Sequence, residues 1–297
     1  MISFTNLGTI YADETQDSTS GNVTRGNRYI NMVHRNILDY WNWPFLEATS
    51  TASTVASQQA YTFGYNFRRV KAVSVTVGSI VYPVTEVSDW EYWNKLNQWG
   101  TSYTSNIPEY FFVKDDTEIQ IYPIPSSAGN TITVVFLKAV KDLSVADYTA
   151  GTASITTATS KYVITGGSTT WTAYMVDRYF QFGLDSTWYK IGTFTSTTSI
   201  SLTRAYGGSD KSSDTYTIGE MPSIPEDYHD LIWLGAAGRY WTLKKEDQHA
   251  AFYIRQFYDG LEKMKKRYGY KSTNQYIKGY RRGEAINPND YPTDLTE

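Results

Sequence analysis

Cysteine is absent from the 297 residues, and long apolar runs are absent too. A chain without thiols has no disulfides, no thiolate nucleophile and no Cys-ligated metal. No apolar run approaches the roughly 20 residues that a membrane-spanning helix needs. The first residues, Met1 to Thr5, lack the charged and apolar regions of a signal peptide. These absences exclude a disulfide scaffold and predict a protein with no membrane partner.

Neither sign of charge dominates the chain, which has 27 basic and 30 acidic residues and a formal net charge of −3. This balance argues against general electrostatic binding to nucleic acid. Aromatic residues are abundant instead, with 26 Tyr, 9 Trp and 12 Phe. Tyr and Trp are favoured at protein interfaces, and sugar-binding surfaces use the same residues. Composition therefore leaves protein and carbohydrate partners open.

The residues of common catalytic sites are sparse. The three histidines, His34, His229 and His249, do not follow a metal-ligand spacing. No nucleophile elbow, phosphate-binding loop or dinucleotide fingerprint is present. Paired carboxylates could serve a glycosidase, but Asp115 and Asp116 fall in a predicted hairpin turn, where Asp is ordinary. The sequence predicts no enzyme, no cofactor and no metal.

The longest helical pattern extends from Pro225 to Tyr268 and predicts an αα-hairpin. Ser223 is the expected N-cap, with Glu226 three residues later. Glycine and alanine at positions 235–238 predict a close neighbouring helix. Apolar residues then recur at steps of four and three, at Ala250, Ile254, Phe257, Leu261, Met264 and Tyr268. The hairpin begins with acidic and ends with basic side chains: Glu226, Asp227, Asp230, Lys263, Lys265, Lys266 and Arg267.

The N-terminal half predicts helices followed by β-hairpins. A short helix is expected around Phe4 to Tyr11, an acidic loop at Asp13 to Asp17, and a longer helix from Thr24 to Trp41. A further short helix is expected from Asp89 to Trp99. Expected strands lie at 60–63, 69–77, 80–84, 108–113, 118–123 and 131–137, with turns at Gly78-Ser79 and Lys114 to Thr117.

Composition changes near Asp147, where a Ser/Thr/Gly-rich stretch of short strands begins and continues to Gly219. Turn residues every 8–12 positions or so indicate a small β-barrel or sandwich. We therefore divide the chain into a discontinuous core (1–146 and 221–270), an inserted β-module (147–220) and an extended tail (271–297). The predicted fold class is α+β. In the module, Trp171, Trp188 and Tyr189 are candidate glycan contacts, with a core role as the alternative.

The order of motifs carries more information than any one of them. Trp43-Pro44-Phe45-Leu46 is followed by Asn66 to Val70, then by Pro108 to Phe111 and Ile119 to Pro125. After the insertion come Ile224 to Ile232 and the second helix of the hairpin. This order resembles the head-to-tail adaptor (connector, head-completion) proteins of tailed bacteriophages, over about residues 20–146 and 221–270.

The resemblance implies a structural virion protein of the phage neck, made in the host cytoplasm. It implies a homo-oligomeric ring, with twelve copies expected, that joins the portal protein to a tail or nozzle protein. Genomic DNA would pass through the lumen without sequence-specific binding. The charges at the two ends of the hairpin would pair between neighbouring subunits, because a closed ring uses heterologous contacts. The tail would reach the portal, through Tyr276, Ile277, Tyr280, Arg281, Arg282 and Tyr291.

Two other functions remain open from the sequence. A carbohydrate-binding tail or neck accessory protein would act through the inserted module. A peptidoglycan or polysaccharide hydrolase would depend on Asp115 and Asp116.

Overall fold

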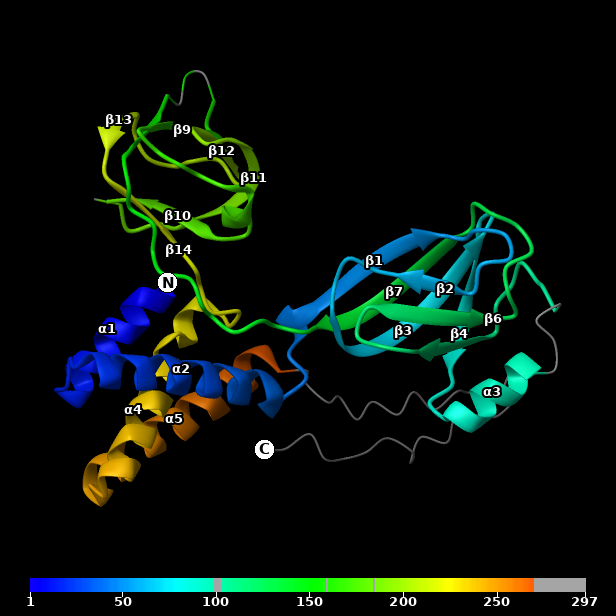
Figure 1. The fold of residues 1–297 in the computed structure, drawn as a ribbon, viewed down its shortest axis with the longest axis horizontal. Helices are drawn as coiled ribbons and strands as arrows, with labels where there is room; N and C mark the ends of the chain where they lie inside the picture. The colour runs from blue at the N-terminus through cyan, green and yellow to red at the C-terminus, as the bar shows by residue number, and fades with distance from the viewer. Residues whose placement is uncertain (99–102, 157, 159, 184, 270–297) are drawn as a thin grey trace, which may run out of the picture.

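A computed structural model describes residues 1–98, 103–156, 158, 160–183 and 185–269. Four helices form a bundle, one curled sheet extends from it as an arm, and a second curled sheet lies beside the bundle (Figure 1). The predicted α+β class is confirmed, including the β-rich module and the αα-hairpin. The bundle, the arm and the module each have a separate hydrophobic core.

The bundle is built from two helices at each end of the described chain. They are α1 (Phe4–Thr15), α2 (Ser20–Tyr40), α4 (Asp230–Lys244) and α5 (Asp247–Tyr268). On α2 the apolar residues Ile30, Val33 and Ile37 recur at helical spacing and are buried against the other helices. Because this face is continuous along several turns, packing rather than propensity stabilises the helix.

The hairpin of α4 and α5 packs as closely as its small residues predict. A Cβ on Gly235 would lie 2.7 Å from Val33 Cγ1 of α2 and 3.1 Å from Phe257 Cδ2 of α5. A Cβ on Gly260 would lie 2.3 Å from Leu231 Cδ2. Both glycines therefore allow a helix approach that alanine would obstruct.

Three predicted boundaries in the helices are wrong. Helix α2 was expected from Thr24 but begins at Ser20, where the Thr19 side chain caps it. The acidic run was expected to be a loop from Asp13, but α1 continues to Thr15, whose buried hydroxyl donates to the Tyr11 carbonyl at 2.8 Å. The hairpin was expected to start at a Ser223 cap. Instead, a 3-10 turn, η3 (Glu226–Tyr228), precedes α4, and the Ser223 backbone N–H donates to His34 Nε2 at 3.1 Å.

The arm is a seven-stranded sheet in the order β1-β7-β3-β4-β5-β6-β2. Its strands are β1 (Glu47–Ser53), β2 (Ala60–Thr62), β3 (Phe67–Val77), β4 (Ile80–Glu86), β5 (Tyr110–Val113), β6 (Glu118–Tyr122) and β7 (Thr131–Lys138). The predicted hairpin at Gly78 is confirmed, since Val77 pairs with Ile80 and Gly78 has a φ of +62°. Helix α3 (Trp90–Gln98) packs Trp93 and Leu96 against Tyr122.

The inserted module is a second seven-stranded sheet, in the order β13-β8-β9-β12-β11-β10-β14. Its strands are β8 (Thr152–Ile155), β9 (Val163–Gly167), β10 (Tyr179–Phe182), β11 (Tyr189–Ser196), β12 (Ser199–Leu202), β13 (Lys211–Asp214) and β14 (Tyr216–Gly219), with a 3-10 turn, η2 (Ala173–Met175). The two ends of the module meet, because Tyr148 forms an antiparallel bridge with Ile218.

The module is joined to the bundle where α1 begins. Ser3 Oγ donates to Asp147 Oδ2 at 2.7 Å, and the Phe4 backbone N–H donates to the Glu220 carbonyl at 2.9 Å. Glu220 Oε2 also accepts from the backbone N–H groups of Ser144 and Val145. Both ends of the module are thereby tied to the start of the chain.

Candidate interaction surfaces

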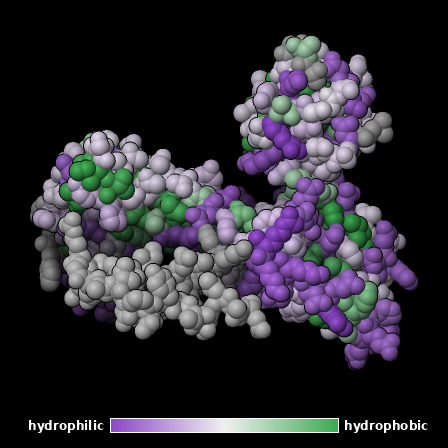
Figure 2. All heavy atoms as spheres, turned by 180° about the vertical axis from the view of Figure 1, so that it is seen from behind, coloured by the Kyte–Doolittle hydropathy of each residue, from purple (hydrophilic) through white to green (hydrophobic). Residues whose placement is uncertain are grey.

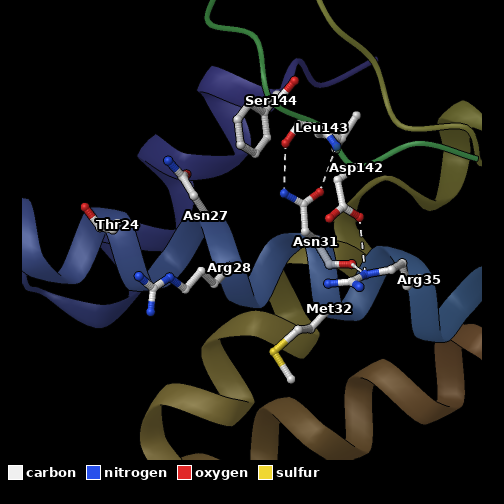
Figure 3. Close-up of a pocket in the computed structure, with 10 residues that line it drawn as sticks. Thr24, Asn27, Arg28, Asn31, Met32, Arg35, Asp142, Leu143 and Ser144 are labelled. Atoms are coloured by element: carbon white, nitrogen blue, oxygen red, sulfur yellow. Dashed lines mark hydrogen bonds and ion pairs between the residues drawn. The ribbon is translucent and has the colours of Figure 1, made fainter.

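A pocket of about 510 Å³ opens beside α2, where the segment after β7 crosses the helix (Figure 3). Its lining combines the apolar side chains of Phe4, Met32 and Leu143 with polar ones. The polar residues are Thr24, Asn27, Arg28, Asn31, Arg35, Asp142 and Ser144. A pocket of this kind suits a side chain or short segment from another protein better than a reaction, because no nucleophile–base pair lines it.

One half of the pocket is held together by internal bonds. Asn31 Nδ2 donates to the Leu143 carbonyl at 2.8 Å, and the Leu143 N–H donates to Asn31 Oδ1 at 2.8 Å (Figure 3). Arg35 Nε lies 3.2 Å from Asp142 Oδ1. One amide thus satisfies both backbone groups of Leu143 and fixes the crossing segment on α2.

The other half of the pocket presents donors. Arg28 and Thr24 are exposed, and Arg25 lies one turn earlier on the exposed side of α2. Within the described chain neither Arg25 nor Arg28 has an acidic partner. No local pattern in the sequence indicates this pocket, because its other wall comes from residues more than 100 positions away.

The hairpin charges are largely used within the subunit. Arg267 Nη1 lies 2.7 Å from Asp227 Oδ2, so the acidic start and basic end of the hairpin meet in one chain. Glu226 pairs with the Met1 amino group at 2.5 Å. Lys265 Nζ lies over the Trp41 ring, 4.3 Å from its centroid.

Three of the predicted charges stay available to a neighbour. Asp230 accepts a hydrogen bond from Trp233 Nε1 at 3.3 Å and has no basic partner among the described residues. Lys263 and Lys266 are exposed, and neither pairs with an acid in that part of the chain. The predicted portal-binding residues Tyr276, Ile277, Tyr280, Arg281, Arg282 and Tyr291 lie outside the described residues.

Two histidines are buried as structural groups. His229 Nδ1 accepts from the Ile2 backbone N–H at 3.0 Å, and its Nε2 lies 3.2 Å from the Ile224 carbonyl. Burial lowers the pKa of His34 to about 4 and also lowers the pKa of His229. Within the described ranges no group of three His, Asp or Glu side chains could hold a metal ion.

The three candidate glycan contacts are buried in the inserted module. Trp171 has no exposed surface, and its Nε1 donates to Tyr216 Oη at 2.9 Å. Tyr189 packs on Tyr206, with ring centroids 5.3 Å apart, and Trp188 is also buried. This arrangement corresponds to the core role that the sequence left open, and it presents no ring face on which a sugar could stack.

The carboxylate pair at Asp115 and Asp116 forms turn contacts. Asp115 Oδ1 accepts from the backbone N–H groups of Thr117 and Glu118, both at 2.8 Å. These hydrogen bonds hold the pKa of Asp115 below its usual value. Asp116 Oδ2 accepts from Asn66 Nδ2 at 2.7 Å. The pair stabilises the β5–β6 turn.

The arm exposes apolar side chains that the sequence analysis did not select. Ile80 and Val81 are exposed in the β3–β4 hairpin, and Trp90 and Tyr92 are exposed in the first turn of α3. Figure 2 shows apolar surface gathered at the end of the arm that points away from the helices. Alternation and helical spacing predicted these elements but could not say which of their apolar residues lack a covering layer.

More than half of the chain matches a known protein family. A family model described as SU10 adaptor protein matches residues 5–163, more than half of the chain. The matched range covers α1 from its second residue, α2, the arm and the first strand of the module. No curated protein matches the chain. In the described residues no helix is both long and apolar enough to cross a membrane.

Proposed function

The chain belongs to the SU10 adaptor protein family, a family of phage adaptors, and on that premise we propose that it forms a ring in the phage neck. The ring, expected to hold twelve copies, joins the portal protein to a tail or nozzle protein. Its inner wall forms part of the channel through which the genome passes. The observation that carries the proposal is the family match over the bundle helices α1 and α2 and the whole arm.

The architecture supports a ring subunit. The bundle and the arm are separate folded bodies with separate cores, so one subunit offers surfaces at well-separated places (Figure 1). Head-to-tail contacts between different surfaces generate a ring when the rotation closes. The mild net charge of −3 suits a channel wall that DNA passes without being held.

The hairpin of α4 and α5 is proposed as part of the wall between subunits. Since Asp227 and Arg267 already pair within one chain, the charges available to a neighbouring copy are Asp230, Lys263 and Lys266. The tail, residues 271–297, is proposed to bind the portal protein.

Binding to the portal protein tests this assignment. The full chain and a chain ending at residue 270 are each mixed with the portal assembly of the same phage and separated by size-exclusion chromatography. The full chain is expected to co-elute with the portal, and the shortened chain to bind far less. Co-elution of neither chain would contradict the adaptor function. Equal binding of both would contradict only the role of the tail.

A further inference from the structure

The first turn of α3 holds two large aromatic side chains in solvent. Trp90 is 55% exposed and Tyr92 is 44% exposed. The turn is rigid, because Asp89 Oδ1 accepts from the backbone N–H groups of Glu91 at 2.8 Å and Tyr92 at 3.3 Å. The Trp90 ring rests on Phe112, with centroids 5.3 Å apart. Rigid exposed Trp and Tyr side chains are typical anchors of protein interfaces.

The stretch of sequence that contains α3 is rich in acidic residues. Residues 80–122 contain seven carboxylates and two lysines. Glu91, between the two aromatic residues, is exposed and has no basic partner among the described residues. This turn therefore offers an aromatic ring and an unpaired carboxylate side by side.

The pocket on α2 offers the complementary chemistry. Its apolar side includes Phe4 and Met32, and Met32 is exposed to solvent. Its polar edge includes Arg28, which lacks an acidic partner in the described part of the chain. An arginine beside an apolar pocket can accept both a carboxylate and the face of an aromatic ring. The volume of about 510 Å³ has room for a large aromatic side chain.

We propose that the Trp90–Tyr92 turn of one copy docks in the α2 pocket of a second copy. Trp90 lies against Met32, and Glu91 pairs with Arg28. The contact is between copies, because α3 lies on the arm and α2 in the bundle, well apart along the long axis of the molecule (Figure 1). It joins two different surfaces, the kind of contact that closes into a ring. The inference rests on the proposed function and names a further contact between subunits of the ring, besides the hairpin of α4 and α5.

Cross-linking between two variants tests the contact, and the chain lacks cysteine, so each variant carries one thiol. Thr24→Cys lies at the pocket and Lys95→Cys lies one turn beyond Glu91, so neither removes a proposed contact. The two variants are mixed with a short bismaleimide. As a matched control, Lys161→Cys on the exposed surface of the module replaces Lys95→Cys. The yield of heterodimer cross-linked between positions 24 and 95 (the 24–95 heterodimer) is expected to be at least fivefold higher than the yield of heterodimer cross-linked between positions 24 and 161. Equal yields would overturn the proposal.

Charge reversal sharpens this test. Arg28→Glu in the Thr24→Cys chain is expected to remove the excess of heterodimer, and Glu91→Arg in the Lys95→Cys chain is expected to restore it. Lys161→Glu, which reverses an exposed charge away from the contact, is expected to leave the yield unchanged. If the excess of 24–95 heterodimer persists in the Arg28→Glu variant, the proposed pairing of Glu91 with Arg28 is overturned.

The contact between copies and the adaptor function can be contradicted separately. Rings seen by electron microscopy without a preferred 24–95 cross-link would overturn this contact and leave the adaptor function standing. A preferred cross-link in a chain that never forms rings and ignores the portal would support the contact and contradict the adaptor function.

Discussion

His34 is a buried residue whose protonation affects the stability of the helix bundle. Its Nε2 accepts the Ser223 N–H, while Nδ1 is buried and has no hydrogen-bond partner among the described residues. Burial lowers its pKa, with Asp142 raising it and His229 lowering it to a smaller extent. The neutral imidazole ties α2 to the segment that leads into α4, so protonation there disfavours the folded bundle.

The free energy of unfolding is expected to fall as the pH drops from about 6.5 to about 4. The folded-state pKa of His34, about 4, lies below its ordinary value of 6.5, so the unfolded chain binds more protons in this window. The loss from this residue is at most about 3 kcal/mol. Urea unfolding at several pH values measures it. His34→Gln keeps an acceptor for Ser223 and should lose less stability over the window; the same loss in both proteins would contradict the assignment.

Gly235 shows how close packing overrides helix propensity. Alanine in a helix is normally favoured over glycine by about 1 kcal/mol. At Gly235 the new methyl group would meet Val33, a stiff β-branched side chain, at 2.7 Å. We expect Gly235→Ala to destabilise the protein by about 1–3 kcal/mol in chemical denaturation. Gly21→Ala is the matched control, since nothing lies within 4 Å of the new Cβ. A Gly235→Ala protein as stable as the control would contradict the packing.

At the scale of elements, periodic apolar residues predicted most of the structure. The α2 face, the hairpin of α4 and α5 and the β3–β4 turn all follow patterns of local spacing. Strand β1 was missed because Glu47–Ser53 has no large apolar side chain, and only the small residues Ala48 and Ala52 pack on the core of the arm. It lies at the sheet edge and pairs along its whole length with β7, a partner about 80 residues away that no local pattern reveals.

Interaction surfaces were less predictable than elements. Charge alone selected Asp227 and Arg267 as contacts between subunits, whereas the antiparallel hairpin brings them together in one chain. Aromatic type alone selected Trp171, although tertiary packing buries it. The α2 pocket depends on a crossing segment, and sequence spacing does not place such a segment.

The two hydrogen bonds between the Asn31 side chain and the Leu143 backbone should stabilise the position of the segment after β7 on α2. Asn31→Ala removes two hydrogen bonds to Leu143 and leaves two part-buried backbone groups without these partners. We expect a loss of about 1–3 kcal/mol. Hydrogen exchange at the Leu143 amide and chemical denaturation measure it. Arg25→Ala, at an exposed position of the same helix, is the control, and an equal loss of stability in both variants would contradict a stabilising role of the two Asn31–Leu143 hydrogen bonds.

At the scale of the whole molecule, the module can be removed without disturbing the bundle if it is an independent insertion. Its ends pair at Tyr148 and Ile218, and its core is separate from the other cores. We expect replacement of residues 148–218 by a short Gly/Ser linker to leave a cooperatively folded protein, because the Ser3–Asp147 contact and Glu220 are retained. Thermal unfolding followed by circular dichroism measures this. Loss of helical signal at 25 °C would show that the module is part of the core.

Images of the protein with its portal test the ring-forming adaptor function most directly. Negative-stain electron microscopy of the full chain mixed with the portal assembly should show a closed ring of this protein stacked on the portal. Class averages should repeat around the ring axis. Portal particles without a bound ring, together with a protein that remains monomeric at every concentration tested, would contradict the ring-forming adaptor function.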